Sequence, residues 1–100
     1  MNKPVNLTPQ SRIDISEITE FLTKSWGKKS AELFINKFEK FCLNISAEPG
    51  LFPFFHKRKR IRKCAITKQN IVLYRQSQFT IDVITIFNTR QNPKRLKTFI

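Results

Sequence analysis

Residues 83–96 read VITIFNTRQNPKRL, and the first five are β-branched or aromatic, the residue types most enriched in strands. The run is apolar on both faces of a strand, which is typical of a strand inside a sheet rather than at its edge. It stops at Asn88, and Pro93, which lacks a backbone N–H, closes the polar stretch that follows. The stretch therefore predicts an internal strand whose end presents polar side chains, Arg90 among them.

The sequence before this run predicts further strands. The segments IRKCAI (61–66), IVLYRQ (71–76) and FTIDVITIF (79–87) are separated by connections short enough for hairpins. The opening MNKPVNL (1–7) is read as a first edge strand. The segment LFPFFHKRKR (51–60) is predicted to be a loop, because Pro53 interrupts regular structure.

Two amphipathic helices are predicted in the first half of the chain. In the first, Thr8 is a suitable N-cap and Pro9 suits the first helical position, where its missing N–H costs nothing. Gly27 fits its end. The residues expected on its apolar stripe are Ile15, Ile18, Phe21 or Leu22, and Trp26.

The second helix starts after Gly27 and is expected to end at Pro49-Gly50. Its core face is predicted to carry Phe34, Phe38, Phe41, Cys42 and Ile45, at i, i+4, i+7, i+8 and i+11. Helices first and strands after predict an α+β fold, in which an N-terminal helical hairpin packs on one face of a three- to four-stranded antiparallel sheet. Residues 1–100 are expected to form a single domain.

The charge is distributed unevenly. Residues 1–55 carry seven basic and six acidic side chains, whereas residues 56–100 carry twelve basic and one acidic side chain. Such a one-sided field attracts nucleic acid or an acidic protein segment. No basic amphipathic helix stands out in the second half, so no membrane partner is expected.

The remaining composition excludes several classes. Two cysteines, Cys42 and Cys64, do not make a disulfide framework, and both are expected to be buried, reduced thiols. Neither a membrane-spanning run nor a signal-peptide pattern is visible, so a cytoplasmic location is expected. No metal site and no cofactor is predicted.

In the order of these elements the chain resembles toxins of the RelE/ParE superfamily from bacterial type II toxin–antitoxin modules. The resemblance runs through both helices, the hairpin IRKCAITKQNIVLYRQ (61–76) and the closing VITIFNTRQNP (83–93). After the last strand the family often reads His-Thr-Arg-Gln-x-Pro. Asn88 replaces the histidine here, while Thr89, Arg90, Gln91 and Pro93 match.

The resemblance implies a small α+β toxin with a cognate antitoxin, which folds over the toxin and binds operator DNA as part of the complex. RelE-like members cut messenger RNA at the ribosome. ParE-like members instead inhibit DNA gyrase and cut nothing.

Metal-free RNA cleavage needs a base, an acid and cations for the developing phosphorane charge. Cations are abundant, but His56 is the only histidine and Tyr74 the only tyrosine. Nuclease members tend to carry a basic residue where this chain has Ile71, and Asn88 does not exchange a proton near neutral pH. The sequence therefore favours a ParE-like inhibitor that acts by binding, with a RelE-like ribosome-dependent endoribonuclease as the alternative.

The candidate site residues follow from both readings. If the chain is a ribonuclease, the predicted catalytic residues are Arg90, Arg75, Arg62 and Tyr74. The residues predicted to bind a partner or nucleic acid are Lys57, Arg58, Lys59, Arg60, Lys63, Asn88 and Gln91. A purely structural role stays open for several: Arg90 and Gln91 as residues that hold the turn, Tyr74 as a packed ring, and the run 57–60 as a solvated loop.

Overall fold

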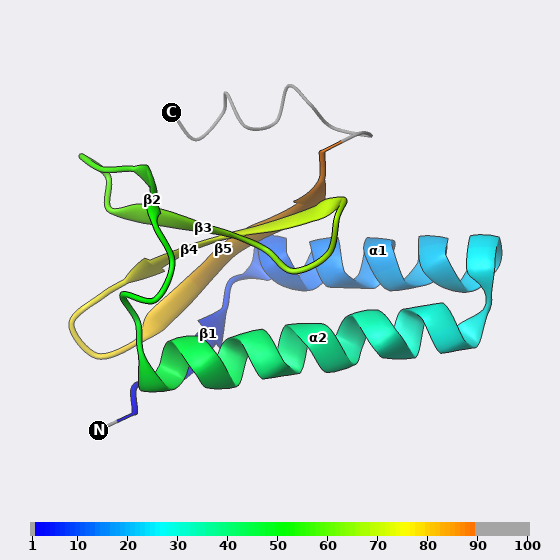
Figure 1. The fold of residues 1–100 in the computed structure, drawn as a ribbon, viewed down its shortest axis with the longest axis horizontal. Coiled ribbons are helices and arrows are strands. Elements are labelled where there is room, and N and C mark those ends of the chain that lie inside the picture. Colours follow the sequence, from blue (N-terminus) through cyan, green and yellow to red (C-terminus); the bar gives the residue numbers. More distant parts are fainter. Residues whose placement is uncertain (1, 90–100) are drawn as a thin grey trace.

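The structure is a computed structural model, and it describes residues 2–89. Within residues 2–89, two helices and five strands follow one another in the order β1, α1, α2, β2, β3, β4 and β5. Both helices lie on one side of the sheet (Figure 1). Strand β1 (Val5–Leu7) precedes the helices, and the remaining strands are β2 (Phe54–His56), β3 (Ile61–Ala65), β4 (Asn70–Gln76) and β5 (Ile81–Asn88).

Helix α1 (Pro9–Trp26) begins as its sequence predicts. The Thr8 side chain accepts a hydrogen bond from the Ser11 backbone N–H, and its hydroxyl donates to the carbonyl of Val83 at 2.8 Å. The same threonine therefore caps the helix and ties its start to β5.

Helix α2 (Lys28–Ala47) follows after Gly27 alone. This glycine has a φ of 93°, in the left-handed region that L-residues with a side chain rarely adopt, so it permits the sharp reversal between the helices. The helical hairpin is thus a consequence of one residue type at one position.

The sheet has the strand order β1-β5-β4-β3-β2. Strands β2 to β5 pair antiparallel, and β1 pairs parallel with β5. The predicted α+β fold with a helical hairpin on one face is confirmed, and β5 is internal, as its apolar sequence indicated. The strand count is higher than the three to four predicted, because Phe54–His56 was assigned to a loop but pairs with β3 as an edge strand.

The core lies between the helices and the sheet. It contains Phe34, Phe38, Phe41 and Ile45 from α2, packed on Cys64, Val72, Tyr74, Ile81, Val83 and Ile86 from the strands. The predicted core face of α2 is confirmed, except that Cys42 is only half-buried. Neither cysteine forms a disulfide.

The predicted apolar stripe of α1 is partly wrong. Ile15, Ile18 and Leu22 pack against the core, but Phe21 is exposed and Trp26 has 74% of its surface exposed. The last turn of α1 extends past the ends of the strands (Figure 1). No helix of the described part is long and apolar enough to span a membrane.

Candidate functional site

The face of the sheet that points away from the helices carries a second apolar cluster. Ile61, Leu73 and Phe87, from three neighbouring strands, are buried there, with Phe55, Ile71 and Ile84 packed around them. Side chains alternate between the two faces along a strand, so residues that share this register lie on this outer face. Ile61 pairs with Arg75, and Lys63 pairs with Leu73, which puts both cations on the outer face.

Arg75 and Lys63 are both exposed. The ammonium group of Lys63 lies 5.9 Å from the ring centroid of Phe55. Arg75 has Asp82 as its cross-strand neighbour, but the Asp82 carboxylate accepts hydrogen bonds from Thr80 and Asn6. Within residues 2–89 the only salt bridge joins Lys24 to Glu20, so Arg75 makes no ion pair there.

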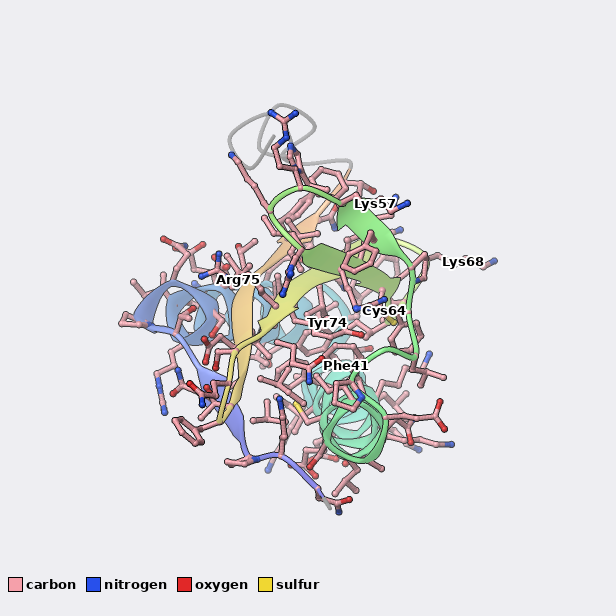
Figure 2. The ribbon with its side chains drawn as sticks, turned by 90° about the vertical axis from the view of Figure 1, so that its left-hand side faces the viewer. Phe41, Lys57, Cys64, Lys68, Tyr74 and Arg75 are labelled. Atoms are coloured by element: carbon pink, nitrogen blue, oxygen red, sulfur yellow. The ribbon has the colours of Figure 1, made fainter. Side chains whose placement is uncertain are left out.

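The turn between β2 and β3 adds four exposed cations, Lys57, Arg58, Lys59 and Arg60. Two hydrogen bonds hold the turn: the Arg60 backbone N–H donates to the Lys57 carbonyl at 3.1 Å, and the Lys59 backbone N–H donates to Nδ1 of His56 at 3.1 Å. Figure 2 shows Lys57 and Arg75 on the side of the sheet away from α2, with Tyr74 and Phe41 on the helix side.

No acidic residue occurs between Glu48 and Asp82. The other acidic side chains belong to the helices, apart from Glu48, which follows α2 directly. The outer sheet face and the 57–60 turn therefore form a surface rich in positive charge, on which Asp82, opposite Arg75, is the only acidic residue within residues 2–89. The other negative charges lie on the helical layer or next to it. We call Lys63, Arg75 and the turn residues 57–60 the basic face.

Arg62 and Tyr74 lie on the other face of the sheet. They are cross-strand partners, and Tyr74 belongs to the core beneath the helices. The Tyr74 hydroxyl donates to the Pro49 carbonyl at 2.9 Å, and Nη1 of Arg62 donates to the Phe52 carbonyl at 2.6 Å. Both side chains thus fasten the segment that leads from α2 to β2.

The surroundings of Tyr74 also affect its chemistry. The ring packs edge-on against Phe41 and Phe52, with centroid distances of 5.6 and 6.5 Å. Burial raises the pKa of the phenol above its ordinary value, because the charged form is poorly solvated there. A phenol with a raised pKa and an occupied hydroxyl is poorly suited to act as a base near neutral pH.

The structure brings together only part of the predicted site. Arg75 and Lys63 share the basic face with the 57–60 turn, whereas Arg62 and Tyr74 belong to the helix side. Asn88 is half-buried at the end of β5, paired with Asn70. Arg90, the first of the predicted catalytic residues, and Gln91, a predicted binding residue, lie outside the described residues.

One buried carboxylate was not singled out from the sequence. Asp14 on α1 is only 2% exposed, and its Oδ2 accepts hydrogen bonds from the Thr85 hydroxyl at 2.5 Å and the Ile86 backbone N–H at 3.0 Å. Oδ1 accepts another from Gln10. The available sequence signal was its position four residues before Ile18, on the face of α1 that packs against the core.

The comparison with known proteins places this geometry in a family. A family model described as the ParE toxin of the type II toxin–antitoxin system parDE matches residues 5–93. The chain belongs to the ParE toxin family. Its predicted identity as a toxin of a type II toxin–antitoxin module is thereby confirmed, as is its place in the RelE/ParE superfamily. No curated protein sequence matches the chain.

Several solved structures share the ParE toxin fold seen here. The chromosomal ParDE system of P. aeruginosa matches with a TM-score of 0.71 at 12% identity, over 86% of this chain and 95% of that one. The E. coli DinJ-YafQ toxin–antitoxin complex matches with 0.61 at 10% identity, over 91% and 97%. A YoeB/ParE toxin from Agrobacterium tumefaciens matches with 0.57 at 18% identity, over 85% and 97%. At these identities the likeness shows a shared fold.

Proposed function

We propose that this ParE-family toxin acts by binding and not by cleavage. Its basic face binds an acidic surface of a protein target such as DNA gyrase, and a cognate antitoxin neutralises it. The antitoxin pairing is supported by the ParDE and DinJ-YafQ structures, which are toxin–antitoxin systems. Operator DNA is contacted only through the toxin–antitoxin complex.

The observation that carries this proposal is that Tyr74, a predicted catalytic residue, lies on the opposite side of the sheet from the cations of the basic face. The basic face holds guanidinium and ammonium groups, but the hydroxyl of Tyr74 lies on the opposite side of the sheet, bonded to Pro49. Nδ1 of His56 accepts a hydrogen bond inside its own turn. Residues 90–100 contain no His, Tyr, Asp, Glu or Cys. General acid–base catalysis most often uses a histidine, so beside the basic face it would depend on His56 or on a lysine ammonium group.

An acidic protein surface suits what the basic face does present. Arg75 is exposed and without an ion pair in residues 2–89, so its guanidinium is free to bind a carboxylate bidentately. Like-signed cations around it raise the association rate with a negative partner. The alternative, a RelE-like ribonuclease, would use the same cations on the phosphate of messenger RNA.

The test is inducible expression of the toxin without an antitoxin, with pulse labels for DNA, RNA and protein synthesis in one culture. The proposal expects DNA synthesis to stop first while messages stay whole, and it expects the purified toxin to inhibit gyrase supercoiling. Translation that stops first, with cut messages, would establish the ribonuclease instead. If none of the three syntheses slows, the toxin proposal fails in both forms.

Arg75→Ala tests the basic face directly. It should weaken inhibition about tenfold or more, since a desolvated charge pair at an interface contributes a few kcal/mol. Lys40→Ala is the matched control, because Lys40 is also an exposed cation but lies on α2, in the helical layer. Equal losses in the two variants would show that only net charge matters.

A further inference from the structure

A groove of about 560 Å³ lies at the edge of the sheet where β2, β3 and the β4–β5 turn meet. Its lining residues are Phe54, Arg60, Arg62, Gln76, Ser77 and Gln78. We call it the edge groove. Its volume falls in the range of small-ligand sites, and none of its lining residues is acidic. Only Arg60 is shared with the basic face.

Arg62 is held in the edge groove with a fixed orientation. One of its nitrogens donates to the Phe52 carbonyl at 2.6 Å, and its guanidinium carbon lies 3.9 Å from the centroid of the Phe54 ring. A guanidinium has five N–H donors, so several remain for a ligand after this contact. The Phe54 residue is 40% exposed, and Arg62 covers one face of its ring. The pair thus presents a flat, partly open platform with a positive charge.

Arg60 occupies a backbone conformation that is costly for its residue type. Its φ of 58° makes it the only residue other than glycine with a positive φ among residues 2–89. Such local strain is energetically unfavourable and is enriched at binding sites. A glycine would serve the turn better, yet the chain has an arginine whose side chain lines the edge groove.

Two amides complete the set of polar groups. Gln76 ends β4 and Gln78 lies in the β4–β5 turn. That turn is held by its own contacts: the Ser77 hydroxyl donates to the Thr80 carbonyl at 2.9 Å, and Lys3 donates to the Ser77 carbonyl at 2.9 Å. Both glutamines are exposed, and their amides carry donors and acceptors together.

This combination matches a nucleotide better than a carboxylate. Guanidinium groups bind phosphate bidentately, aromatic rings and arginine planes stack on bases, and amides pair with base edges. An acidic peptide side chain would use the guanidinium groups but leave the ring and the amides without a role. We propose that the edge groove binds a nucleoside monophosphate unit, with its phosphate on Arg60 and Arg62 and its base against Phe54. This proposal is independent of the target of the toxin.

The test uses the purified full-length toxin. Isothermal titration calorimetry and amide NMR shifts are recorded with adenosine and guanosine monophosphates, with inorganic phosphate and with a short single-stranded RNA. The nucleotides are expected to bind at least about tenfold more tightly than inorganic phosphate, since stacking on an aromatic ring adds to the phosphate contact. The shifts should centre on the edge groove.

Three variants sharpen this test. Arg60→Gly removes the guanidinium and relieves the backbone strain, so it should fold well and bind nucleotide about tenfold more weakly. Phe54→Leu keeps an apolar side chain but removes the ring, and a similar loss is expected. Arg58→Gln is the matched control: it removes a positive charge from the same turn but does not line the edge groove, so less than a twofold change is expected.

The source of the nucleotide is distinguished by the RNA arm. Binding of RNA no tighter than of a mononucleotide would identify a free nucleotide as the ligand. Much tighter binding with the same shifts and the same response to Arg60→Gly would identify a nucleotide within a strand. The proposal is overturned if inorganic phosphate binds as well as the nucleotides, if Arg58→Gln weakens binding as much as Arg60→Gly, or if RNA binds without shifts at the edge groove.

Discussion

The carboxylate of Asp14 on α1 accepts a hydrogen bond from the hydroxyl of Thr85 on β5, across 71 positions of sequence. The same oxygen accepts the backbone N–H of Ile86. Asp14 and Thr85 are both buried. Their contact joins α1 to β5, the strand that ends at Asn88. It therefore links the helical layer to the part of the sheet from which residues 90–93 continue.

Replacement of Asp14 by alanine should destabilise the fold by about 2–4 kcal/mol, because it leaves a buried hydroxyl and a buried N–H without an acceptor. Asp14→Asn is the matched variant. An amide oxygen in the place of Oδ2 still accepts both bonds, so this variant should lose less than half as much. Urea unfolding followed by circular dichroism measures both values. Equal losses for the two variants would contradict the role given to the oxygen.

Trp26 and Phe38 provide a contrast between two aromatic residues of the helical hairpin. Trp26 is 74% exposed and Phe38 is 5% exposed. Trp26→Ser should therefore change the free energy of unfolding by less than about 0.5 kcal/mol, whereas Phe38→Ala should lower it by about 3–5 kcal/mol. The pair is compared by urea denaturation. A large loss for Trp26→Ser would mean that the last turn of α1 is buried in solution.

Tyr74→Phe isolates the hydrogen bond to Pro49. The ring contacts with Phe41 and Phe52 remain, and only the hydroxyl is lost, so a destabilisation of about 1 kcal/mol is expected. Amide hydrogen exchange should increase mainly in the segment between α2 and β2. If stability and exchange are both unchanged, the hydroxyl does not fasten this segment.

The Cys42 thiol makes stability depend on alkaline pH. Burial, aided by the negative charge of Glu39, raises the pKa of Cys42 to about 11 from the ordinary value of 9.0. In the unfolded chain the thiol loses its proton first. Its contribution to stability is therefore complete below about pH 9 and falls as the pH rises from 9 towards 11.

Thermal unfolding between pH 8 and pH 11 checks this dependence. In the Cys42→Ala variant the unfolding temperature should fall less steeply with rising pH than in the parent protein. It should still fall, because burial also raises the pKa values of Cys64 and Tyr74. Alkylation by iodoacetamide at pH 8 should likewise be slow in the folded protein and fast in urea. Rapid alkylation of Cys42 in the folded protein would contradict a raised pKa.

The sequence by itself determined the elements whose cause is local. Thr8 and Pro9 start α1, Gly27 separates the helices, and the spacing of Phe34, Phe38 and Phe41 sets the inner face of α2. Each of these follows from the side chains of a few neighbouring residues. The apolar run 83–87 likewise predicted an internal strand, since the apolar side chains on both faces of such a strand must be buried.

Only the tertiary structure decided which distant residues share a face. Arg75 and Tyr74 are neighbours in sequence, yet the alternation of the strand sends one to the basic face and the other into the core. The pairing of β2 with β3 could not be predicted, because β2 has only three residues, Phe54–His56. That is too few to show the alternation of apolar and polar side chains that indicates a strand. The burial of Asp14 could not be predicted from the sequence, because its acceptor role depends on Thr85 and Ile86, which only folding brings to it.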